Sequence, residues 1–126
     1  MNFSSNKAIY IQIADLICEK ILLQEFKQDE RIPSVRELAI DLEVNPNTVM
    51  RTYEYLQSLD IITNKRGVGF FVSNEGIKKA SDYRKAEFME QELPALLKTM
   101  ALLKIELSEL DELFRAYFQN IKKSNP

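Results

Sequence analysis

The sequence predicts a mainly α-helical fold with one small β-hairpin, followed by a short helical tail. Apolar residues recur at spacings of three and four within residues 8–23, 34–42 and 46–59, which is the pattern of amphipathic helices. Strand-forming residues flank a glycine-bearing loop in residues 61–72, and helical spacings return after residue 77. We place the boundary in the polar linker 73–76, which gives domains of residues 1–73 and 74–126.

The first helix is expected at residues 8–23. Its apolar residues on one face are Tyr10, Ile13, Ala14, Ile17 and Ile21. Cys18, the chain's one cysteine, is expected to fill space on this helix, with a redox sensor as the alternative. The polar residues 24–32 then form a connecting loop.

The second helix begins after Ser34, which is an N-cap residue followed three residues later by Glu37, the spacing of a capping box. Its apolar face contains Val35, Leu38, Ala39 and Leu42. Arg36 lies away from that face and projects outward, where it is either a DNA contact, a solvated charge or a partner of Glu43.

The third helix spans roughly residues 46–59 and follows a turn at residues 43–45. Asn45 is suited to cap it and Pro46 to occupy its first position. The buried stripe is Val49, Tyr53 and Leu56. Arg51 falls on the opposite face with Asn47 near it and Thr48 to one side, and such a face can contact base edges and phosphates. The alternatives are first-turn capping by Asn47 and Thr48, and pairing of Arg51 with Glu54 or packing on Tyr55.

The hairpin pairs residues 61–64 with residues 70–72 around a tip that contains Lys65, Arg66, Gly67 and Gly69. Two helices joined by a tight turn, followed by a cationic ribbon, can enter neighbouring grooves of a duplex. The sequence therefore predicts a winged helix-turn-helix that binds double-stranded DNA. Taken alone, the tip could also be an ordinary turn or a weak phosphate cradle.

The tail is expected to be helical from residue 77 to 104, with a kink or break at Pro94, and again from a cap at Ser108 to about Asn120. Its apolar stripes suit a subunit interface better than a ligand pocket, because two such helices enclose little volume. The predicted dimer-interface residues are Phe88, Leu93, Leu96, Leu97, Met100, Leu103, Leu110, Leu113, Phe114 and Tyr117.

Composition limits the functional classes. The net charge is −2, and residues 1–75 carry eight basic and eleven acidic side chains, a balance that counts against nucleic acid unless the cations are grouped. The sequence has no histidine, no catalytic carboxylate pair and no metal-spaced cluster, so we expect neither an enzyme, a metal nor a cofactor. It also has no apolar run of membrane-spanning length and no signal-peptide layout, so a cytoplasmic protein without a membrane partner is expected.

Residues 10–72 resemble the winged helix-turn-helix of the GntR family of bacterial transcription regulators. The matching residues include Pro33-Ser34-x-Arg36, Val44-Asn45-Pro46-Asn47-Thr48-Val49, Tyr53-x-x-Leu56 and Gly67-x-Gly69-x-Phe71-Val72. The resemblance implies that Ser34 and Arg36 contact DNA backbone and base, and that Asn47 and Thr48 lie in the major groove. It also implies that the hairpin tip around Arg66, Gly67 and Gly69 reaches the minor groove.

The short tail resembles the YtrA-like branch of that family, in which it is a dimerisation module. This implies a homodimeric repressor on a palindromic operator, often of transporter genes, with no effector identified. The chain departs from the family pattern at Met50, where many members have arginine, and at Gln24, Asp29 and Asp60, where many have glycine. A winged-helix module that binds proteins rather than DNA is the alternative function.

Overall fold

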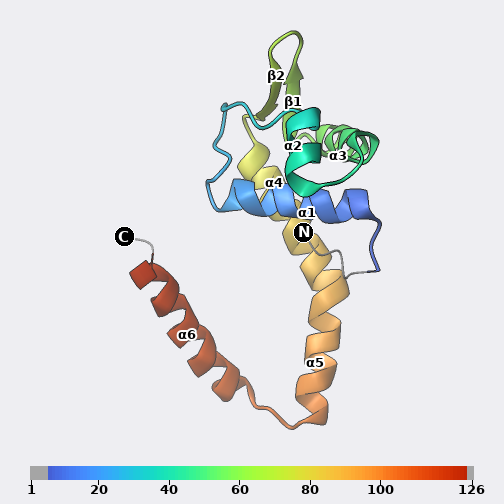
Figure 1. Cartoon of the computed structure of the whole chain (residues 1–126). Helices are drawn as coiled ribbons and strands as arrows, with labels where there is room; N and C mark the ends of the chain where they lie inside the picture. Colours follow the sequence, from blue (N-terminus) through green and yellow to red (C-terminus); the bar gives the residue numbers. More distant parts are fainter. Residues whose placement is uncertain (1–5, 125–126) are drawn as a thin grey trace. The chain divides into compact units, whose positions relative to one another are not determined.

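The computed structural model describes residues 6–124, which form two compact units that divide between Ala86 and Glu87. Residues 1–5 and 125–126, at the outer ends of the two predicted domains, lie outside the described residues. The elements in chain order are α1 (Ile9–Leu22), α2 (Val35–Leu42), α3 (Pro46–Ser58), β1 (Ile62–Lys65), β2 (Gly69–Val72), α4 (Gly76–Glu87), the π-helical turn η1 (Phe88–Glu92), α5 (Leu93–Leu102) and α6 (Leu107–Ser124) (Figure 1). Within residues 6–124, none of the helices is both long and apolar enough to span a membrane.

The core of the first unit forms where α3 packs against α1, α2 and β1 (Figure 1). The predicted stripes are confirmed, because Ile13, Ile17 and Ile21 of α1 are fully buried and so are Val49, Tyr53 and Leu56 of α3. Tyr10, which was expected on the same face of α1, is only half-buried.

The predicted caps of α2 and α3 are confirmed. The Glu37 amide donates to Ser34 Oγ at 3.1 Å, and the Ser34 amide donates to Glu37 Oε1 at 3.0 Å, which completes the capping box. Asn45 Oδ1 accepts from the Asn47 amide at 2.8 Å with Pro46 in the first turn of α3. These caps fix where α2 and α3 begin, and therefore which side chains stand at their first turns.

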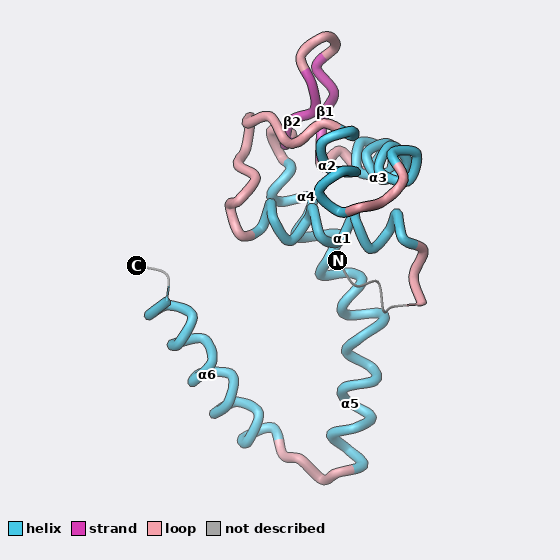
Figure 2. Tube along the Cα trace, viewed as in Figure 1, coloured by secondary structure: helices cyan, strands magenta, loops and turns pink. Residues whose placement is uncertain are grey.

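The hairpin is also confirmed, with β1 and β2 antiparallel in a register that pairs Ile62 with Val72 and Lys65 with Gly69 (Figure 2). We call residues 62–72 the wing. Residues 24–32, which were expected to form only a loop, also make two isolated β-bridges to β2. Arg31 pairs with Phe71, and Gln28 pairs with Val72. The backbone before α2 is thereby joined to the base of the wing.

Helix α4 packs with the first unit, because Gly76 and Ala80 are buried and the Tyr55 hydroxyl donates to the Tyr83 hydroxyl at 3.0 Å. A Cβ on Gly76 would lie 2.6 Å from the Ile61 carbonyl oxygen, so only glycine fits where α4 begins. The compact unit thus extends past residue 73. The functional boundary at 73/74 stays a prediction.

In the second unit, the α-helical pattern breaks next to Pro94, as predicted. The π-helical turn η1 ends at Glu92, just before this proline. Proline lacks an N–H and its ring clashes with the carbonyl of the preceding turn, and a wider turn relieves that clash. The predicted cap at Ser108 is wrong. Helix α6 already begins at Leu107, where the Glu106 amide donates to Glu109 Oε2 at 2.9 Å, and it continues to Ser124.

Candidate nucleic-acid interface

The beginning of α2 presents Arg36 to solvent. Its side chain is exposed, and within residues 6–124 it forms no ion pair with Glu43 or any other acid. Ser34 is half-buried and its oxygen is occupied as a cap, although its hydroxyl proton can still be donated. The Tyr53 hydroxyl donates to the Pro33 carbonyl at 2.5 Å, which ties α3 to the residue just before this turn.

The beginning of α3 brings Asn47, Thr48 and Arg51 together. With Ala8, Ile9 and Tyr10 they line a shallow depression of about 360 Å³. Asn45 caps the helix by accepting from the backbone N–H of Asn47, so the exposed side-chain carboxamide of Asn47 is not needed for capping and can bind elsewhere. Thr48 is half-buried, and its carbonyl accepts from the Thr52 hydroxyl.

Among the described residues Arg51 forms no ion pair with Glu54, and its aromatic contact is with Tyr10. Its guanidinium carbon lies 3.9 Å from the centre of the Tyr10 ring, which belongs to α1. A cation over an aromatic face is attracted by the ring quadrupole, so the contact restricts a long, exposed side chain. The side chain of Arg51 is still exposed and can meet an anion.

The wing holds the remaining predicted residues. Arg66 and Gly67 are exposed at its tip, and Gly67 has a φ of +79°, which suits glycine. The Lys65 ammonium lies 4.2 Å from the centre of the Phe71 ring. The rings of Phe70 and Tyr53 meet edge to face at 4.9 Å between centroids, so the wing is anchored on α3.

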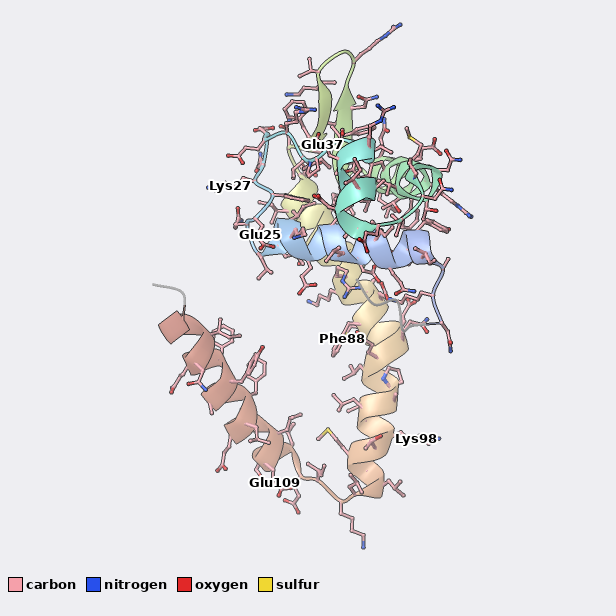
Figure 3. All side chains as sticks on the ribbon, viewed as in Figure 1. Glu25, Lys27, Glu37, Phe88, Lys98 and Glu109 are labelled. Carbon is pink, nitrogen blue, oxygen red and sulfur yellow. The ribbon has the colours of Figure 1, made fainter. Side chains whose placement is uncertain are left out.

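Arg31 was not among the predicted residues. Its side chain crosses Gly69, where an added Cβ would lie 2.9 Å from Arg31 Nε. Its Nη2 atom is 3.7 Å from Glu37 Oε1, and Figure 3 shows Glu37 at the beginning of α2. Arg31 therefore links the wing to the first turn of α2. The extended conformation imposed near Pro33 was the only sequence signal for this pairing.

Electrostatics at α2 favour a charged Glu37. Its two hydrogen bonds with Ser34, and secondarily the Arg31 guanidinium, hold the pKa of this carboxyl below its usual value.

Burial, with a smaller effect of the Asp15 charge, raises the pKa of the Cys18 thiol to about 12. A buried thiol that stays protonated is unreactive, which favours the space-filling role. In the described part of the chain, no group of three or more His, Cys, Asp or Glu side chains is arranged to hold a metal.

Helices α2 and α3, joined by a tight turn, precede a cationic wing that is anchored on α3. This arrangement defines a winged helix-turn-helix DNA-binding domain. Residues 9–72 match the family described as bacterial regulatory proteins, gntR family. The chain belongs to this GntR family of transcriptional regulators, whose members bind DNA.

The relatives extend over most of the chain. The uncharacterized HTH-type transcriptional regulator YhcF of Bacillus subtilis is 36% identical over 110 residues, which cover 87% of this chain and 89% of YhcF. The HTH-type transcriptional repressor YtrA of the same organism is 32% identical over 118 residues, 94% of this chain and 90% of YtrA, which confirms the YtrA-like resemblance. A GntR-family structure from Bacteroides thetaiotaomicron has 43% identity and a TM-score of 0.70, and covers 90% of this chain and 98% of its own. These relatives are regulators of transcription rather than enzymes.

Proposed function

We propose that the chain binds a palindromic operator as a homodimer and represses the adjacent promoter by excluding polymerase. The observation that carries the proposal is the exposure of Arg36, Asn47 and Arg51 on two helices whose apolar sides are locked in one core. In this arrangement α3 enters the major groove, the first turn of α2 meets the backbone, and the wing tip reaches the neighbouring minor groove. Operator binding takes place in the bacterial cytoplasm, on the nucleoid.

The apolar tail supports the homodimer. None of the ten predicted interface residues is buried by the chain itself, and Leu113 is 68% exposed. A hollow of about 710 Å³ between α5 and α6 is lined almost entirely by apolar side chains, among them Phe88, Leu93, Leu96, Leu110 and Phe114. Contiguous apolar surface of this kind costs free energy in water, and a second copy would cover it.

The relatives support the regulatory outcome. YtrA is named a transcriptional repressor, and that name favours repression here. Control of transporter genes is proposed from the YtrA-like resemblance. The protein-interaction alternative is less well supported, because the exposed cations and amides lie at the first turns of α2 and α3 and on the wing, where DNA contact needs them.

The DNA part of the proposal is tested by incubating the pure protein with sheared genomic fragments and mapping the protected sites by nuclease digestion. We expect two inverted half-sites about 34 Å apart, which is one helical turn. Absence of any protected fragment at low salt would refute operator binding.

The dimer is tested by sedimentation velocity. Wild-type protein should sediment as a dimer, and a double variant with Leu113→Asp and Phe114→Asp should sediment as a folded monomer. Leu23→Asp is the matched control, because Leu23 is an exposed leucine (62%) of the first unit and lies outside the proposed interface. A monomeric wild type, or a dimer that survives both tail substitutions, would contradict this role of the tail.

A further inference from the structure

Met50 interrupts the polar outer face of α3. The buried stripe of this helix contains Val49, Tyr53 and Leu56, so residues 47, 50, 51 and 54 face outward at about 100° per residue. Met50 is 40% exposed and belongs to no core cluster. An exposed apolar side chain therefore lies at the side of this outward face, about 100° from the centre of the buried stripe and next to Asn47.

Neither Asn47 nor Arg51 is placed to cover Met50, so the Met50 side chain can contact DNA directly. Asn47 precedes it by three residues, so the two side chains lie on the same side of α3, about 4.5 Å apart along the axis. Arg51, the one cation of α3, is drawn toward α1 by the Tyr10 ring. No arginine is thus centred on α3 to bind guanine.

The chemistry of the major groove offers one apolar target. Of the four bases, only thymine presents a methyl group in the major groove, and apolar side chains recognise this methyl by contact. The unbranched, polarisable thioether of methionine adapts to such a surface. Asparagine matches the N6 and N7 atoms of adenine in two hydrogen bonds. The axial spacing of Asn47 and Met50, about 4.5 Å, is about a third larger than one base step of about 3.4 Å, so two flexible side chains can reach neighbouring base pairs.

We propose that Met50 is a specificity-determining residue whose side chain contacts the C5-methyl group of a thymine in each half-site, beside a base pair whose adenine binds Asn47. The inference rests on the proposed binding of operator DNA and adds to it the identity of the two base pairs read by Asn47 and Met50 of α3. Selectivity for A·T pairs at these positions follows, because neither group offers the donor fork that guanine requires.

The test uses the full chain and duplexes selected from a random library. Each thymine of the selected half-site is replaced in turn by deoxyuridine, which removes only the methyl group. For wild-type protein we expect one position per half-site at which affinity falls about fourfold, equivalent to about 0.8 kcal/mol for one buried methyl. Met50→Ala removes the contact from both half-sites of the dimer, so it should bind the thymine duplex about 16-fold more weakly and should no longer distinguish uracil there.

Controls separate this contact from general effects. Ile40→Ala removes another exposed apolar side chain (70% exposed), on α2, and should keep the uracil effect unchanged. Equal loss on thymine and uracil duplexes in Met50→Ala, or no uracil-sensitive position in wild type, would overturn the contact while leaving DNA binding intact. Failure to select any duplex would instead refute the proposed function.

Discussion

The guanidinium of Arg51 on α3 lies over the ring of Tyr10 on α1, 3.9 Å from its centre. Tyr10 in turn meets Tyr55 edge to face, and Tyr55 donates to the Tyr83 hydroxyl on α4. The main-chain carbonyl of Tyr10 accepts from the Thr52 hydroxyl at 2.8 Å, which fixes α1 against α3. The orientation of a candidate DNA contact therefore depends on residues from three helices.

Replacing Tyr10 by leucine should weaken DNA binding although Tyr10 itself need not touch DNA. Loss of the aromatic face frees Arg51 to sample other conformers, and an exposed cation–π contact contributes about 0.5–1 kcal/mol. We expect dissociation constants about two- to fivefold higher by fluorescence anisotropy. Tyr10→Phe retains the ring face and should bind like wild type. Equal affinities for the leucine and phenylalanine variants would contradict the positioning role.

Replacing Arg36 by alanine should cost about 1–3 kcal/mol of binding free energy on the selected site. Arg36 is exposed, so the thermal midpoint should change little. Lys27, on the loop between α1 and α2 (Figure 3), offers a matched exposed cation away from α2 and α3, and Lys27→Ala should bind almost normally. If both variants bind equally well, Arg36 makes no contact of its own.

The sequence predicted the features of the fold that depend on residues close together in the chain, such as the caps of α2 and α3. The capping box of Ser34 and Glu37 and the cap at Asn45 formed as expected, because a cap needs only residues a few positions apart. At Ser108 the same logic failed, since Glu109 bonds the Glu106 amide and the helix begins earlier. The contacts of Arg31 with Gly69 and of Arg51 with Tyr10 join distant segments and leave no periodic trace in the sequence.

The missing glycines of the family pattern also have a structural consequence. Gln24, Asp29 and Asp60, where the resemblance to the family implies glycine in many members, all have positive φ, between 63° and 64°. Side chains strain this left-handed backbone, and aspartate tolerates it better than glutamine.

Gln24→Gly should therefore stabilise the protein. Relief of the left-handed strain of about 1–2 kcal/mol exceeds the entropy that glycine adds to the unfolded chain, about 0.5–1 kcal/mol. We expect a higher free energy of unfolding in urea titrations, and a smaller gain for Asp60→Gly. Lys20→Gly, inside α1, is the opposite control and should lose about 1 kcal/mol. A Gln24→Gly variant no more stable than wild type would show that the loop carries no strain.

Stability should depend on Glu37 at acidic pH. Its hydrogen bonds with Ser34 and the Arg31 charge lower the carboxyl pKa in the folded state below the ordinary 4.5. A depressed folded-state pKa stabilises the native state above the unfolded pKa, and this stabilisation is lost as pH falls through the folded value. The difference in thermal midpoint between wild type and Glu37→Gln should be constant near neutral pH and should shrink below about pH 4.5. A difference that stays the same down to pH 3 would exclude linkage at this residue.

Salt dependence distinguishes phosphate-led binding from other modes in a chain whose net charge is −2. If each subunit makes about three to four phosphate contacts, the logarithm of the association constant should fall with log salt at a slope of about −6 for a dimer. Removing the exposed Arg66 from both wing tips takes away about one contact per subunit, so Arg66→Ala should reduce the slope by about 2. Met50→Ala removes no charge, so its slope should match that of wild type even where its affinity falls. A wild-type slope near zero would mean that the grouped cations do not engage the backbone, and an unchanged slope in Arg66→Ala would place the wing tip away from the phosphates.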